Sequence, residues 1–169
     1  MTERNRVQVG IVMGSDSDLE VLQEAGKVLK ELGVTYEMVV ASAHRSPERA
    51  RRYAREAEAR GIRVLIAGAG GAAALPGFLA SECPLPVIGV PINSTPLNGL
   101  DSLLSMAQMP MGVPVATMAV GKAGAGNAGI LAIEILSLND AALRRRLLGY
   151  RKRMAKDVEE RSRRLANQK

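Results

Sequence analysis

The sequence is poor in aromatic residues, cysteine and histidine. Its four aromatic residues, scattered from Tyr36 to Tyr150, are too few to form a stacking platform for single-stranded nucleic acid. The single cysteine, Cys83, excludes an intrachain disulfide and suits a reducing compartment. No His, Cys or carboxylate residues are spaced as metal ligands, so we expect no metal.

The sequence also lacks an uninterrupted apolar run long enough for a membrane helix. Residues 64–81, 83–100 and 102–121 are uncharged, but proline and glycine interrupt each of them. The polar start, Met1–Arg6, and a following apolar run that ends by Met13 predict no signal peptide. We therefore expect a cytoplasmic protein without membrane association, formed by one domain over residues 1–169.

Positive charge is confined to one end of the chain. The net charge is +6, but residues 141–169 carry 11 Lys and Arg against 3 Asp and Glu, which is +8 and leaves −2 for residues 1–140. The excess belongs to a predicted C-terminal helix over residues 140–168 and not to the core over residues 7–138. We therefore expect no nucleic-acid partner.

Apolar strands alternate with helices along the core. The strands are predicted at residues 7–13, 36–41, 64–67, 87–90 and 115–120. The first helix is predicted from the helical spacing of Leu22, Ala25, Leu29 and Leu32, with Gly33 ending it, and the later helices at 47–60, 76–81, 100–108 and 127–138. Near-continuous apolar strands in such an alternation are typical of a parallel sheet covered on both faces. The prediction is a three-layer, flavodoxin-like α/β fold with five parallel strands in the order 2-1-3-4-5.

Two features point to self-association. Residues 64–133 hold only three charged side chains, fewer than a monomer's surface usually carries. The C-terminal helix has a narrow apolar stripe that suits packing onto a neighbouring subunit, although packing onto its own body fits equally. The stripe consists of Leu143, Leu147, Tyr150, Met154 and Val158.

The segment Gly14–Asp18 ends the first strand and opens the first helix. Small residues, the hydroxyls of Ser15 and Ser17 and a helix N-terminus suit an anion such as phosphate. Asp18 would repel phosphate and is better suited to accept hydrogen bonds from a ribose diol. Ordinary helix capping explains the same residues.

The segment Ser42–Pro47 contains the chain's one histidine, His44, beside Arg45 in a strand-to-helix loop. Ser46 suits an N-cap and Pro47 the first helical position. A proton carrier next to a fixed cation indicates acid–base chemistry on an anionic small molecule. A solvated loop histidine without a role is the alternative.

Two glycine-rich segments lie further along the chain. Gly68, Gly70 and Ala73 imitate a dinucleotide fingerprint, but an acidic residue is missing about 20 positions later. We expect instead that the loops after the first three strands meet around a mononucleotide-sized pocket. The segment 121–127 lacks the ending of a phosphate loop and is predicted to allow close backbone approach at the pocket rim or a subunit contact.

Taken in order, six segments resemble the N5-carboxyaminoimidazole ribonucleotide mutases of purine biosynthesis, the PurE family, over roughly residues 7–138. His44-Arg45 and Gly70-Gly71 are similar to the bacterial mutase class, whereas the related carboxylase class typically has lysine after the histidine. The matching segments are Gly14–Asp18, Ser42–Pro47, Ala67–Ala73, Asp101–Ser105, Gln108–Thr117 and Gly121–Ala128.

The resemblance implies an octamer with sites between subunits and no metal or cofactor. It implies transfer of a carboxylate from the exocyclic nitrogen of an aminoimidazole ribonucleotide to C4 of its ring. His44 would be the general acid and base, and Ser15, Asp18 and Arg45 would bind the ribose phosphate. The further substrate-binding residues expected are Ser17, Ser42, Gly70 and Gly71.

One position departs from the family pattern G-G-A-A-H-L-P-G, because this chain has Ala74 in place of the histidine. The role of that histidine therefore does not transfer. Two alternatives to a mutase remain open: a carboxylase or decarboxylase that exchanges free CO2 with a related mononucleotide, and a catalytically silent nucleotide-binding paralogue.

Overall fold

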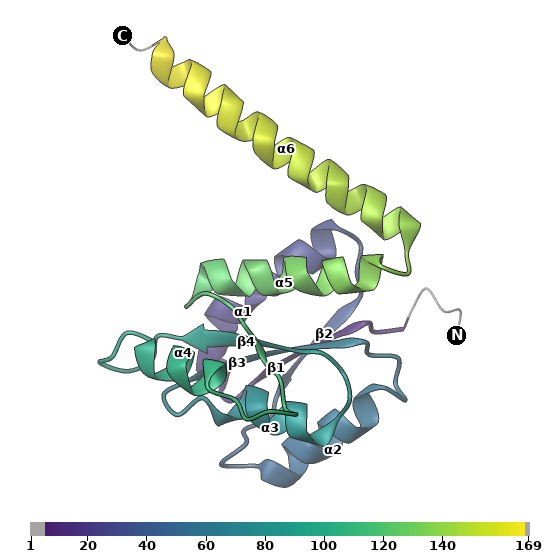
Figure 1. Cartoon of the computed structure of the whole chain (residues 1–169), viewed down its shortest axis with the longest axis vertical. Helices are drawn as coiled ribbons and strands as arrows, with labels where there is room; N and C mark the ends of the chain where they lie inside the picture. The colour runs from purple at the N-terminus through teal and green to yellow at the C-terminus, as the bar shows by residue number, and fades with distance from the viewer. Residues whose placement is uncertain (1–5, 168–169) are drawn as a thin grey trace.

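The computed structural model describes residues 6–167, and a five-stranded, all-parallel sheet lies at its centre (Figure 1). The order β2-β1-β3-β4-β5 confirms the predicted topology. Strands β1 and β4 are buried along their whole length, while β2 lies at an edge and is only partly buried. The strands are β1 (Val9–Met13), β2 (Tyr36–Val40), β3 (Val64–Gly70), β4 (Val87–Ile92) and β5 (Ala116–Thr117).

Helices cover both faces of the sheet, which confirms the three-layer prediction. On one face α1 (Leu19–Glu31) and α5 (Lys122–Ser137) pack over side chains such as Ile11 and Ile66. On the other face α2 (Pro47–Ala57), α3 (Ala74–Glu82) and α4 (Leu100–Ala107) cover a second apolar cluster. The two clusters fix the strands, so the loops at the carboxyl edge of the sheet are held in place.

The predicted bounds of several elements were wrong: β3 and β4 run on to Gly70 and Ile92, α2 ends at Ala57, and the clearest differences are at β5 and α5. The fifth strand was expected over residues 115–120 but only Ala116 and Thr117 pair with β4 in register; beyond them Met118 N and Gly121 N still donate single hydrogen bonds to β4 carbonyls. Helix α5 begins at Lys122, not at Asn127. Its first turns contain glycine because a Cβ atom at Gly124 would lie 1.6 Å from the carbonyl oxygen of Ala119.

The C-terminal helix α6 (Ala141–Ala166) leaves the body and projects away from it (Figure 1). The Asp140 side chain caps it by accepting hydrogen bonds from Ala142 N and Leu143 N, each at 2.9 Å. Leu143 and Leu147 are buried against the body of their own chain, so that alternative holds for the first two turns. Tyr150 is partly buried against the same cluster, whereas the outer end of the predicted stripe is not, because Met154 is 52% and Val158 66% exposed. Residue 168, the predicted helix end, lies outside the described residues.

Within residues 6–167, no helix combines the length and the apolar character that crossing a bilayer requires.

Candidate active site

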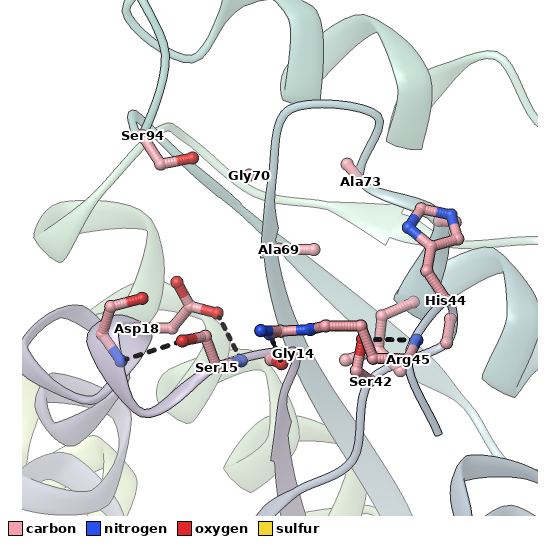
Figure 2. Close-up of a pocket in the computed structure, with 14 residues that line it drawn as sticks. Gly14, Ser15, Asp18, Ser42, His44, Arg45, Ala69, Gly70, Ala73 and Ser94 are labelled. Carbon is pink, nitrogen blue, oxygen red and sulfur yellow. Dashed lines mark hydrogen bonds between the residues drawn. The ribbon is translucent and has the colours of Figure 1, made fainter. Parts of the chain in front are cut away.

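The loops that follow β1, β2, β3 and β4 surround a cavity of about 320 Å³ at the carboxyl edge of the sheet (Figure 2). This is where open α/β sheets bind ligands, next to the point at which the strand order reverses. The cavity brings together seven of the eight residues expected to form the site. They are Ser15, Ser17, Asp18, Ser42, His44, Arg45 and Gly70.

The loop after β1 is folded around the Asp18 carboxylate. Residues Asp16–Asp18 form a short 3-10 turn, η2, which Ser15 caps: its Oγ accepts a hydrogen bond from Ser17 N at 3.3 Å, while Ser15 N donates to Asp18 Oδ2 at 3.2 Å. Burial raises the pKa of Asp18 above its ordinary value, and hydrogen bonds and the nearby Arg45 charge offset only part of the rise. A carboxylate with little water contact gains most from a ligand that donates hydrogen bonds to it.

The loop after β2 is closed by its own serines. Ser46 occupies the N-cap position of α2, with Pro47 at the first helical position as predicted, but its hydroxyl forms no cap hydrogen bond. Instead Ser46 Oγ accepts from Ser42 N at 3.1 Å and donates to the Ser42 carbonyl at 3.2 Å. Ser42 Oγ in turn accepts from Arg45 N at 3.2 Å. The predicted capping role of the Ser46 hydroxyl was therefore wrong, and that hydroxyl instead fixes the loop that carries His44.

Arg45 joins this loop to the first one. Its Nη2 donates to the carbonyl oxygen of Gly14 at 2.7 Å, which leaves the other guanidinium donors for a ligand. Both Arg45 and His44 are exposed, and the imidazole points towards Ala73 in the loop after β3 (Figure 2). The arrangement places a fixed positive charge near the centre of the cavity and a proton carrier at one end.

The loop after β3 brings bare backbone to the cavity. Ala73 adopts the left-handed conformation, with φ of 45°, and α3 begins behind it without any side-chain cap, so amides of its first turn lack a side-chain partner. Ala74 and Leu75, its first residues, line the cavity. Gly71 does not line it: with φ of 58° it turns the loop, and its α-hydrogens face Thr95.

Ser94, in the loop after β4, is a lining residue that the motifs did not indicate. It belongs to no nucleotide-binding pattern, and only the strand order signals it, because that order places β4 next to β3.

The polar groups of the cavity are hydroxyls, one carboxylate, one guanidinium and one imidazole. In the part of the chain from residue 6 to 167, no three His, Cys, Asp or Glu side chains lie close enough to hold a metal ion. The set suits a small molecule that carries an anionic group, hydroxyl groups and a site of proton transfer.

The chain matches known proteins along almost its whole length. The sequence model of the family described as "AIR carboxylase" matches residues 8–157. Proteins named "N5-carboxyaminoimidazole ribonucleotide mutase" from Pyrococcus horikoshii and Thermotoga maritima are 58% and 54% identical to it, over 93% and 94% of this chain and 88% and 91% of theirs. The one from Bacillus subtilis is 60% identical over 82% of this chain and 86% of its own.

Solved structures agree with the sequence comparison. The crystal structure of Treponema denticola PurE superposes with a TM-score of 0.84 at 30% identity, over 94% of this chain and 98% of that one. A second crystal structure from the same organism, of a PurE2 variant, gives a TM-score of 0.86 at 29% identity, over 95% and 98%. With the fold, the cavity and these relatives in agreement, the chain belongs to the AIR carboxylase (PurE) family.

Proposed function

We propose that the protein is an N5-carboxyaminoimidazole ribonucleotide mutase, which converts that compound to 4-carboxyaminoimidazole ribonucleotide in purine biosynthesis. The observation that carries the proposal is the placement of His44, Arg45 and Asp18 on one cavity in a chain more than half identical to proteins named for this reaction.

The ribose phosphate binds through charge and hydroxyl groups. Arg45 has free guanidinium donors for the phosphate, and Ser15, Ser17 and Ser42 add short polar side chains around it. Asp18 accepts hydrogen bonds from the ribose hydroxyls. The aminoimidazole ring then lies towards His44, beside the backbone of Gly70 and the start of α3. Gly71 stays within this proposal only as a residue that shapes the loop.

His44 moves the one proton that the reaction requires. The imidazolium protonates the exocyclic nitrogen as its bond to the carboxylate carbon breaks, which releases CO2 and aminoimidazole ribonucleotide. The ring carbon C4 attacks the retained CO2, and the neutral imidazole removes the C4 proton, so the histidine returns to its starting state. No net proton or carboxyl group is gained or lost, as a mutase requires.

Ala74 leaves this scheme intact. It lines the cavity with a methyl group at the first position of α3, and every proton transfer above uses His44 alone.

The test is an isotope experiment. Purified protein is incubated with fresh N5-carboxyaminoimidazole ribonucleotide, without ATP, in ¹³C-labelled bicarbonate. Unlabelled 4-carboxylated product supports the mutase. Labelled product supports the alternative, a carboxylase that uses free CO2, and nucleotide binding without product supports a silent paralogue.

The His44→Asn variant tests the proton carrier. Turnover is expected to fall by about 10²–10⁴, while binding of aminoimidazole ribonucleotide, measured by calorimetry, stays within about twofold because asparagine keeps the size and polarity of the site. Retained turnover would contradict the assignment of His44.

The protein is further proposed to act in the cytoplasm as a homo-oligomer, an octamer by the family resemblance. Large apolar side chains that are at least half exposed support this proposal: Met154 and Val158 on α6, and Leu97, Leu104 and Met111 on the body.

Analytical ultracentrifugation of wild type should give a mass of about eight chains. Met154→Ser/Val158→Ser should reduce that number, whereas Lys152→Ser on the opposite face of α6 should not; equal masses for all three would contradict a role of the helix.

A further inference from the structure

The Ser94 hydroxyl is a polar group of the cavity to which the scheme above gives no role. It lies in the loop after β4 and lines the same cavity as Asp18 and Gly70. The hydroxyls of nearby Thr95 and Ser102 already have hydrogen-bond partners, the Asp101 carboxylate at 2.6 Å and the Gly99 carbonyl at 2.9 Å. The Ser94 hydroxyl has no such partner among residues 6–167 and is available to a ligand.

The loop that carries Ser94 is held rigidly. Ser94 N donates to the Ile92 carbonyl at 3.0 Å, and the buried Ser102 hydroxyl contacts that same carbonyl at 3.2 Å. The Thr95–Asp101 hydrogen bond closes the other side of the loop. A group already ordered in the free protein loses little conformational entropy when it binds.

Gly70 makes room for this hydroxyl. A Cβ atom at Gly70 would lie 1.9 Å from Ser94 Oγ and 3.2 Å from the Ile92 carbonyl oxygen. Ser94 Oγ therefore lies directly against the backbone of Gly70, where any other residue would place a side chain. This contact joins the loop after β4 to the end of β3.

The position of Ser94 selects the kind of group that it meets. The strand order places β4 three strand intervals from β2, roughly 14 Å at the usual spacing. In Figure 2, Ser94 lies on the side of Asp18, and His44 lies at the other end of the cavity. An anion beside Asp18 would be repelled, whereas a neutral hydroxyl donates to the carboxylate and accepts from serine.

We propose that Ser94 binds a ribose hydroxyl of the nucleotide beside Asp18, and so fixes the sugar while the base lies at His44. This inference rests on the proposed function. It makes Ser94 a determinant of ribose recognition, in addition to the residues that the motifs indicated.

The test compares three ligands by calorimetry: aminoimidazole ribonucleotide and its 2′-deoxy and 3′-deoxy analogues. Ser94→Ala is expected to weaken binding of the ribonucleotide roughly three- to tenfold and to leave the affinity for one of the deoxy analogues unchanged, because that analogue lacks the hydroxyl in question. The control is Ser105→Ala, an exposed serine of α4 outside the cavity, which should bind all three like wild type.

Kinetics give a second readout. With the mutase substrate, Ser94→Ala should raise KM and leave kcat within about twofold, because the lost contact is made equally in the ground and transition states.

Two results would overturn the inference. One is unchanged affinity of Ser94→Ala for the ribonucleotide, and the other is an equal loss for all three ligands, which indicates a general disturbance of the pocket. Failure of wild type to bind any of the three contradicts the proposed function itself.

Discussion

Helices α5 and α6 follow one another in the chain, separated by residues 138–140, yet they are held in place in different ways. Helix α5 buries small residues such as Ala128, Gly129 and Ala132 against α1 and the sheet. Helix α6 buries only Leu143 and Leu147 and carries most of the chain's excess positive charge on an exposed rod. Packing within the same chain therefore fixes the position of α5. The outer turns of α6 gain little stabilisation from such packing.

The largest expected difference is in the free energy of unfolding, when one leucine is truncated beneath α5 and another on the outer part of α6. Leu29→Ala, in α1 beneath α5, removes a fully buried side chain and should lower the free energy of unfolding by about 2–5 kcal/mol. Leu165→Ala on α6 removes a side chain that is 69% exposed and should change it by less than about 0.5 kcal/mol. Urea denaturation measures both, and equal losses would mean that the outer end of α6 is as tightly packed as the layer formed by α1 and α5.

Two glycine-to-alanine substitutions, one in α5 and one in α6, should change the stability of the protein in opposite directions. At Gly129 in α5 a Cβ atom would lie 2.9 Å from the Ala25 carbonyl oxygen, so Gly129→Ala should destabilise by roughly 1–3 kcal/mol. At Gly149 in α6 the nearest atom is 3.9 Å away, and Gly149→Ala should stabilise by about 0.5–1 kcal/mol through helix propensity. Thermal unfolding decides the signs; a stabilising Gly129→Ala would contradict the close contact between α1 and α5.

The smallest effect is a pH dependence. The Glu82 carboxylate accepts hydrogen bonds from Arg51 Nε at 3.1 Å and Arg55 Nε at 2.9 Å, and these arginines lower its pKa below the ordinary 4.5. Its stabilisation is therefore present above pH 4.5 and is lost as the pH falls from there through the folded-state pKa.

Glu82→Gln should accordingly lower the melting temperature at about pH 7 and approach wild type at about pH 3. Glu159→Gln on α6, where the arginine nitrogen is 3.9 Å away, should follow the wild-type curve throughout. A Glu82→Gln deficit that persisted unchanged in acid would show that the ion pairs are not its cause.

The sequence predicted the parts of the fold that depend on periodicity and on strand order. Parallel strands place their carboxyl ends at one edge, so motifs after β1, β2 and β3 had to meet, and His44, Arg45 and Asp18 line one cavity. The family assignment and the order of the strands were confirmed. The roles of the individual site residues stay predictions.

Where prediction missed, the cause was side-chain geometry that a linear pattern does not contain. Ser46 stands at an N-cap position but bonds back to Ser42. Gly71 follows Gly70 in the chain, yet its positive φ turns it from the cavity. Ser94 has no motif, and its place depends on a contact across two loops.

The edge position of β2 has a consequence for how occupancy of the site can be followed. Strand β1 is fully buried between β2 and β3, whereas β2 has one paired edge and carries the His44 loop. Amide hydrogens in β1 should exchange with solvent only on global unfolding, and those of β2 and residues 41–46 through local fluctuations. A bound nucleotide would join Arg45 and His44 to the central loops and so suppress these fluctuations. Slower hydrogen exchange at β2 would therefore report ligand binding directly.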